Sequence, residues 1–167
     1  MPLNKERIYV ALYHWAILVG PKNENEGRKG TRFHAKEEMT TADGKLQLNW
    51  IFERCPPTTA STAMILVRVL IGKVARKERL ESVLESVPIR ADQSGWNCVE
   101  WVREAVLGLE RDGRALGTCE TSWDAIRDTA MRYVEEKRSQ HRFDGRGEFD
   151  MSKIATWDLL ERKETIE

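Results

Sequence analysis

Cys98 is the residue of this sequence whose setting points most directly to chemistry. Asn97 before it is a good helix N-cap, and Glu100 follows three residues later, as in a capping box. Cys98 is therefore expected in the first turn of a helix, among unpaired backbone amides and at the positive end of the helix dipole. Both effects favour the thiolate, the nucleophilic form of cysteine. The opposing interpretation is a buried structural cysteine, because free cysteine is among the most buried residue types.

A histidine is the natural base for such a thiol, and His14 is the first candidate. It lies within RIYVALYHWAILVG, which is rich in β-branched and aromatic residues and is expected to form one central strand over Arg7–Gly20. On an apolar strand its imidazole would be desolvated, and a buried neutral imidazole is suited to acid–base work near pH 7. The alternative is a core histidine whose hydrogen bonds are satisfied.

The other two histidines have weaker claims from the sequence. His34 lies on a predicted short strand over Thr31–Glu37 and shares a face with Arg32 and Lys36. That pattern favours an exposed side chain, unless the face borders a cleft. His141 stands in a polar segment and is assigned no role.

The cysteines and histidines do not form a metal-binding pattern. Cys55 stands beside two prolines and Cys119 follows Gly117 in a predicted loop, so both are interpreted as structural or incidental. A zinc site needs three or four ligands, usually with a close local pair, and no such pair occurs here. We therefore expect neither a metal nor another cofactor.

The elements that would position these residues indicate an α+β fold. A turn signal at Asp43-Gly44 and a break at the two prolines separate β-like segments from a helical second half. A further strand is predicted over Leu46–Glu53, and helices over Arg76–Val87, Cys98–Asp112 and Ser122–Ser139. The pattern of Ala63–Val74 fits either a buried strand or a helix, and its β-branched content favours a strand at least through Leu70. The expected architecture is an antiparallel β-sheet packed against about three helices in one domain over 1–139. A polar C-terminal tail is expected over 140–167, with docking of its few apolar residues on the core left open.

Composition narrows the class of protein further. The 167 residues are 41% hydrophobic and 32% charged, as in soluble globular domains. Lys plus Arg equals Asp plus Glu, 27 each, which gives no general reason to expect a nucleic acid or an anionic membrane as partner. Three unpaired cysteines suit a reducing compartment, and neither a signal peptide nor a membrane-spanning run is recognised. A cytoplasmic location is expected, and the oligomeric state is left open.

Three short motifs together resemble the permuted papain-like enzymes of the NlpC/P60 superfamily. They are HWAILVG from His14, RFHAKE around His34, and NCVEWV from Asn97, and the nearest in motif are the lecithin:retinol acyltransferase and HRAS-like suppressor families. The permuted members run histidine, polar residue, cysteine, which is the order found here. The resemblance implies a circularly permuted papain-like core with Cys98 as nucleophile, His14 as general base and His34 as the group that orients His14. The whole chain is also similar to a family of uncharacterised fungal proteins, which implies little about substrate.

The chemistry implied by this resemblance is acyl transfer through a thioester. The Cys98 thiolate would attack a carbonyl carbon, and water or an amine would then release the acyl group. The Cys98 backbone N–H is the natural first oxyanion donor, and Gln93 is a candidate for the second, although it also reads as a solvated loop residue. Trp96 and Asn97 are placed on the substrate side of the site, whereas Trp101 is expected in the core.

The sequence thus predicts a cysteine-dependent hydrolase or acyltransferase acting on an amide, ester or thioester of a small molecule or peptide. Two alternatives remain open, a catalytically inactive papain-like binding or scaffold domain and a PPPDE-like isopeptidase. The charged end ERKETIE differs from the hydrophobic anchor of the membrane acyltransferases, so no membrane anchor is expected. Cys98 is expected to have the lowest pKa of the three thiols.

Overall fold

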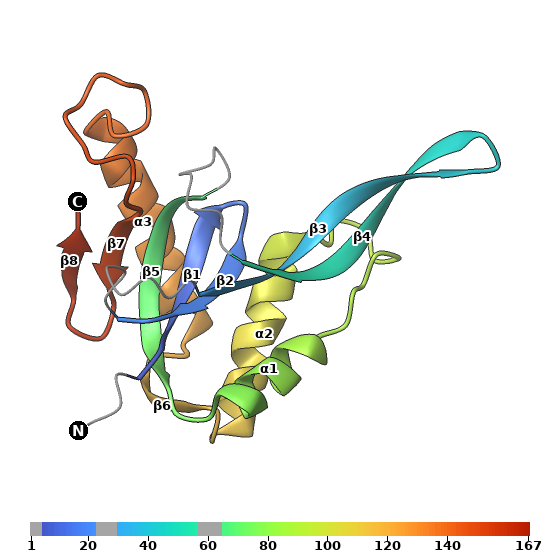
Figure 1. Ribbon diagram of the computed structural model, residues 1–167, viewed down its shortest axis with the longest axis horizontal. Helices are drawn as coiled ribbons and strands as arrows, with labels where there is room; N and C mark the ends of the chain where they lie inside the picture. The colour runs from blue at the N-terminus through green and yellow to red at the C-terminus, as the bar shows by residue number, and fades with distance from the viewer. Residues whose placement is uncertain (1–4, 23–29, 57–64) are drawn as a thin grey trace.

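The computed structural model describes residues 5–22, 30–56 and 65–167, which form a mixed β-sheet and three helices (Figure 1). The strand order is β4-β3-β2-β1-β5-β7-β8, and β6 pairs with β5. The strands are β1 Arg7–Tyr13, β2 Ala16–Gly20, β3 Thr31–Ala42, β4 Lys45–Cys55, β5 Ile65–Val74, β6 Leu116–Cys119, β7 Ala155–Asp158 and β8 Lys163–Ile166. The helices are α1 Lys77–Glu85, α2 Cys98–Asp112 and α3 Trp123–Ser139. The main core lies between the sheet and these helices.

The segment Arg7–Gly20 forms a hairpin and not the single strand that the sequence predicted. β1 and β2 pair antiparallel up to Ala11 opposite Ala16, and the chain reverses through His14 and Trp15. Both strands run through the middle of the sheet and are buried on both faces, and the turn between them contains none of the Gly, Pro, Asn, Asp or Ser residues that usually mark a turn. His14 therefore lies at the end of a tight hairpin, which the uniform pattern concealed.

β3 and β4 form a long hairpin whose outer part projects from the body of the protein (Figure 1). Its turn is Asp43-Gly44, with φ of 51° and 73°, the left-handed pair that a two-residue hairpin turn requires. This confirms the predicted turn, and it sets the register of the whole ladder. His34 consequently lies directly opposite Glu53.

The helix that carries the candidate nucleophile has the predicted bounds and the predicted cap. The Asn97 side-chain oxygen accepts hydrogen bonds from the backbone N–H groups of Val99 at 2.9 Å and Glu100 at 3.4 Å. At the other end Gly113 adopts φ of 65° and closes the helix in the left-handed conformation that suits glycine. Trp101 is fully buried and packs on Phe52 of β4, with ring centroids 5.8 Å apart, which anchors α2 to the sheet.

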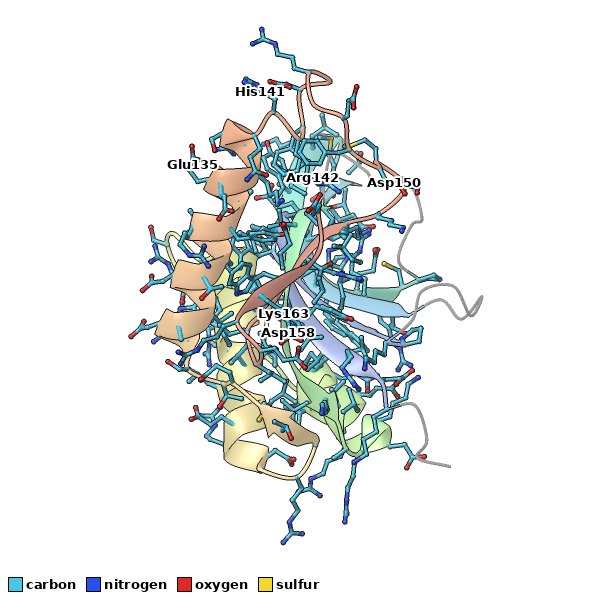
Figure 2. The ribbon with its side chains drawn as sticks, turned by 90° about the vertical axis from the view of Figure 1, so that its left-hand side faces the viewer. Glu135, His141, Arg142, Asp150, Asp158 and Lys163 are labelled. Carbon is cyan, nitrogen blue, oxygen red and sulfur yellow. The ribbon has the colours of Figure 1, made fainter. Side chains whose placement is uncertain are left out.

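The last two strands make the sheet mixed, whereas the sequence predicted an antiparallel one. β7 pairs in parallel with β5, and β8 returns antiparallel to β7. Arg142, only 3% exposed, donates to the backbone oxygens of Lys153 and Glu167, and so ties the connecting loop to the chain end. Figure 2 shows Arg142 pointing inward and His141 outward. Residues expected as a polar tail thus contribute two strands to the sheet.

The loop predicted around Cys119 contains the short strand β6. Cys119 pairs with Gly72 of β5, and a Cβ on Gly72 would lie 2.9 Å from the Cys119 Cβ, so the close pairing depends on glycine at that position. Within the described ranges, no helix is both long and apolar enough to cross a bilayer.

Candidate active site

Cys98 is the first residue of α2 and is half-buried. Figure 1 shows the start of α2 beside the base of the β3–β4 hairpin, and α2 packs against β2 and β3. The Cys98 sulfur lies within hydrogen-bonding reach of three backbone N–H groups, those of Trp15, Val99 and Cys98 itself. Because Trp15 follows His14 directly, the thiol lies against the turn that carries the candidate base.

Burial, and not the helix terminus, dominates the ionisation of this thiol. Desolvation raises the pKa of Cys98 above its ordinary value, and the Glu37 carboxylate raises it further. The three backbone amides lower the pKa but do not outweigh the burial. The expectation of an acid-shifted Cys98 is therefore wrong, because the cap could be read from the local sequence and the packing around the sulfur could not.

His14 presents an imidazole nitrogen suited to accept a proton. Its Nε2 is fully buried and has no hydrogen-bond partner in the part of the chain that the structure describes. The ring bonds instead to the backbone of Ala35, which assigns the N–H to Nδ1 and leaves the lone pair on Nε2. Burial, and secondly the charge of Arg32, hold the pKa of His14 below its ordinary value of 6.5, against the raising effect of the Ala35 hydrogen bond. The His14 ring is therefore uncharged at pH 7.

His34 is buried, contrary to the exposure that its strand pattern favoured. Its side chain is 1% exposed, and Nε2 lies 3.1 Å from a carboxylate oxygen of Glu53. Desolvation is the main cause that lowers the pKa of His34 to about 4, even though the Glu53 hydrogen bond raises it. At neutral pH the ring is uncharged, and Nε2–H donates to the Glu53 carboxylate, which can only accept.

The two histidine rings are in direct contact. Their centroids lie 5.0 Å apart and the ring planes are at 89°, an edge-to-face arrangement. His34 thus limits the orientation of His14 by packing of ring on ring, and the Glu53 hydrogen bond in turn holds His34. The structure brings together the two histidines singled out in the sequence, on β3 and on the β1–β2 turn.

Glu53 is the residue of this cluster that the sequence analysis missed. It pairs with Lys36 and His34, and these contacts, with Lys36 first, lower the pKa of Glu53 to about 2. A signal was available, because a two-residue turn at Asp43-Gly44 places His34 opposite Glu53 by counting along both strands. Reading register from the turn would have found this contact.

Gln93, Trp96 and Asn97 were placed on the substrate side of the site from the sequence, and the structure gives each of them different surroundings. Gln93 is exposed, and its backbone takes part in the turn before α2, with N–H bonded to Arg90 and oxygen to Trp96. Trp96 is buried and packs edge-to-face on Trp50 of β4 at 5.4 Å between centroids. Asn97 is the helix cap. The backbone N–H of Trp15, which carries no side-chain signal in the sequence, interacts with the Cys98 thiol instead.

Among the residues that the structure describes, one trio of side chains has metal-ligand chemistry. His34, Glu53 and Cys55 offer ligand atoms within 4.8 Å of one another. Lys36 already pairs with Glu53, however, and the Arg32 charge acts on His34. A cation would therefore enter a positively charged neighbourhood, and we assign no metal to these residues.

Replacing the cap is expected to weaken the framework of the site. In Asn97→Ala, two backbone N–H groups of the first α2 turn lose their acceptor, so the free energy of unfolding should fall by about 1 kcal/mol. Urea denaturation followed by circular dichroism measures this. Asn97→Asp keeps a capping oxygen and should stay within a few tenths of a kcal/mol of the parent; equal losses in both variants would contradict the capping role.

Fold and site together define an α+β protein with a half-buried cysteine at a helix start and, on the neighbouring strands and turn, two histidines in ring contact with each other. The chain belongs to the DUF6914 family, described as a family of unknown function, whose profile matches residues 4–166. No curated protein and no solved structure matches the chain. The family therefore covers almost the whole chain and leaves the activity to be argued from the site.

Proposed function

We propose that this protein is a cysteine-dependent hydrolase or acyltransferase that acts on an amide, ester or thioester, with a permuted papain-like arrangement of its site. The observation that supports it most is the position of the Cys98 sulfur against the backbone of Trp15, the residue next to His14. The unpartnered Nε2 of His14 is the second. A buried polar nitrogen without a partner is costly in a folded protein, and such groups are often retained for function.

In the proposed reaction the resting site is uncharged. His14 Nε2 takes the proton of the Cys98 thiol as the sulfur attacks the carbonyl carbon of the substrate, and the carbonyl oxygen becomes an oxyanion. Protonated His14 then gives that proton to the leaving group, and the acyl group remains on sulfur as a thioester. Water or an amine attacks the thioester next, with His14 again as base, and the free thiol is restored.

The proposed oxyanion donors are backbone amides. The backbone N–H groups of Cys98 and Trp15 both act on the Cys98 thiol and lower its pKa. The oxyanion, on the carbon that bonds to that sulfur, would lie near the same two donors, where a water-poor environment strengthens the interaction. The proposal assigns this role to Trp15 in place of Gln93, whose side chain is exposed.

A covalent adduct tests the proposal directly. On incubation with a p-nitrophenyl acyl ester, we expect one acyl group per chain, removable by hydroxylamine as thioesters are, and located on Cys98 by peptide mass spectrometry. Cys98→Ser should abolish the hydroxylamine-sensitive adduct, whereas Cys119→Ser, which removes an exposed thiol, should leave it unchanged.

The result that sinks this function is equal acylation of Cys98 and Cys119 in the parent protein, with no turnover of ester. That outcome would favour the scaffold alternative, in which the fold is kept without chemistry. Release of the leaving group from a ubiquitin-type isopeptide analogue, but not from small esters, would instead favour the isopeptidase alternative.

A further inference from the structure

Glu37 lies on the face of β3 that is turned toward α2. Ala35 and Phe33, two and four residues before it, belong to the core between the sheet and the helices, and side chains along a strand alternate between the two faces. Figure 1 shows the start of α2 beside this part of the β3–β4 hairpin. The Glu37 carboxylate accordingly acts on the Cys98 thiol. A negative charge therefore lies near the candidate nucleophile.

Glu37 has no hydrogen-bond or ion-pair partner in the part of the chain that the structure describes, and its side chain is exposed. Cations on neighbouring elements are paired with other acids. Lys36, the preceding residue, pairs with Glu53, and Arg103 of α2 pairs with Glu100 at 3.4 Å. The Glu37 carboxylate is thus free to accept a cation that a ligand brings.

Two tryptophan side chains connect Glu37 to the segment before Cys98. Glu37 is paired across the hairpin with Trp50, which is half-buried, and side chains directly opposite each other on antiparallel strands interact. Trp50 packs edge-to-face on Trp96 at 5.4 Å between centroids, and Trp96 stands two residues before Cys98. The face of an indole attracts a cation more strongly than any other aromatic side chain does. A carboxylate and an indole therefore lie side by side where a cation would bind.

The Trp96 indole adds a polar group without a partner. Its side chain is 8% exposed, and Nε1 is buried with no hydrogen-bond partner among the described residues. Buried polar groups in folded proteins are normally hydrogen-bonded, so an exception calls for an explanation. Because an indole N–H can only donate, an acceptor oxygen of a substrate would satisfy it.

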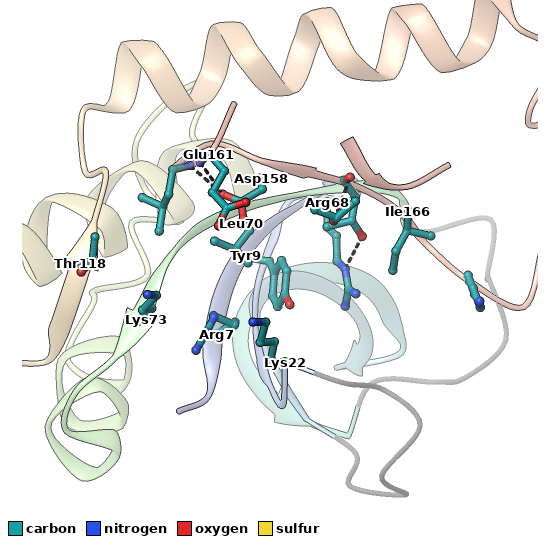
Figure 3. A pocket seen from close by; sticks show the side chains of 14 residues that line it. Arg7, Tyr9, Lys22, Arg68, Leu70, Lys73, Thr118, Asp158, Glu161 and Ile166 are labelled. Atoms are coloured by element: carbon teal, nitrogen blue, oxygen red, sulfur yellow. Dashed lines mark hydrogen bonds between the residues drawn. The ribbon is translucent and has the colours of Figure 1, made fainter. Parts of the chain in front are cut away.

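Cationic side chains gather on the other face of the sheet. A cavity of about 580 Å³ there has Arg7, Lys22 and Lys73 among its lining residues (Figure 3). Arg32, whose charge acts on both histidines, also lies on the face of β3 opposite to that of Glu37, because the two residues are an odd number of positions apart. The side of the sheet that carries Cys98 is thus the one on which a carboxylate can attract a cationic group.

We propose that Glu37 selects substrates whose acyl group carries a cation of the guanidinium or ammonium class. The inference rests on the proposed thiol chemistry and names the substrate class of that site. A guanidinium fork matches a carboxylate in geometry and stacks on aromatic rings, so Glu37 and Trp50 suit it well. A bound cation would also offset the carboxylate charge that opposes thiolate formation at Cys98. Glu37 determines specificity here and takes no part in making or breaking bonds.

A pair of esters tests the selection. p-Nitrophenyl 4-guanidinobenzoate is cationic, and p-nitrophenyl 4-acetamidobenzoate is a neutral analogue. With each rate divided by that of spontaneous hydrolysis, we expect the parent to favour the cationic ester roughly tenfold in kcat/KM, as for one charged hydrogen bond. Glu37→Gln should remove this preference. It should lower kcat/KM for the cationic ester and raise it slightly for the neutral one, because the charge that opposes the thiolate is gone. A general loss of structure would lower both.

Glu38→Gln is the matched control, because Glu38 is exposed and lies on the opposite face of the same strand. The control should keep the preference of the parent, whereas Glu37→Lys should reverse it. Acylation of Cys98 by both esters without preference overturns the inference and leaves the proposed function intact. Equal effects of Glu37→Gln and Glu38→Gln overturn it as well.

Calorimetry with phenylguanidine and its neutral analogue phenylurea separates the cation site from the thiol chemistry. We expect saturable binding of phenylguanidine to the full chain, weaker binding of phenylurea, and roughly tenfold weaker binding of phenylguanidine to Glu37→Gln. Charge-selective binding without acylation of Cys98 by either ester would contradict the proposed function and support the cation site. Equal affinities for phenylguanidine and phenylurea would overturn the cation site.

Discussion

The His14→Ala variant is expected to lower kcat/KM for a small acyl ester by about 10²- to 10⁴-fold at pH 7, the usual contribution of a general base. The reason is the resting state of the site. Burial raises the pKa of the Cys98 thiol and lowers that of the His14 imidazole, so both groups are neutral and the thiol must be deprotonated during attack. Without His14, only the small fraction of spontaneous thiolate reacts.

The pH dependence makes this expectation specific. In the parent protein, kcat/KM should fall as pH drops through the pKa of His14, which lies below 6.5, because protonated Nε2 cannot accept a proton. The His14→Ala defect should shrink as pH rises toward the pKa of Cys98, where the thiolate forms without a base.

Stopped-flow measurement of the acylation rate at a series of pH values, for the parent and His14→Ala, tests this pH dependence. His141→Ala serves as the control, because His141 is exposed. His14→Ala with activity within twofold of the parent, beside an inactive Cys98→Ser, would assign the base to another residue. A His14→Ala defect of constant size at every pH would argue for a positioning role only.

The His34→Gln variant is expected to resist mild acid better than the parent protein. The pKa of His34 is about 4 in the folded protein and about 6.5 in an unfolded chain, where burial no longer acts. Between these values the unfolded state binds a proton that the folded state does not, so the free energy of unfolding falls as pH falls. The difference of about 2.5 pKa units corresponds to roughly 3 kcal/mol of stability lost between about pH 6.5 and 4.

Urea denaturation at a series of pH values measures this loss. Carboxylates titrate in part of the same range in every variant, so the informative quantity is the difference between parent and His34→Gln. Glutamine at this position keeps an N–H donor for Glu53. His141→Gln, at an exposed position, should follow the parent curve. Parallel curves for the parent and His34→Gln above pH 5 would show that His34 titrates normally.

Features governed by neighbouring residues could be read from the sequence. The start, cap and end of α2 follow from Asn97 and Gly113, which satisfy backbone groups within one turn of themselves. The Asp43-Gly44 turn defines the β3–β4 hairpin for the same reason, and it even contains the register that pairs His34 with Glu53. Short-range hydrogen bonds and backbone conformations specify these features, so no knowledge of the packing was needed.

Other features depended on residues far apart in the chain. The reversal at His14 lies between two strands that are buried on both faces, and only pairing of β1 with β5 and of β2 with β3 shows where one strand ends. The parallel pairing of β7 with β5 joins residues nearly ninety positions apart in sequence. The β7 segment is too short for its hydrophobic pattern to predict a strand.

The ionisation of the site also belongs to the tertiary structure. For Cys98 the local sequence correctly indicates a helix start, whose amides lower the pKa, but the surrounding protein removes water and raises it more. His34 sits on a strand face with two cations and was expected to be exposed, yet it is buried and neutral. Residue types and their order therefore identify the cysteine and the histidines as candidate site residues. Burial by distant segments decides their charge, because desolvation is a property of the packed molecule and not of a local pattern.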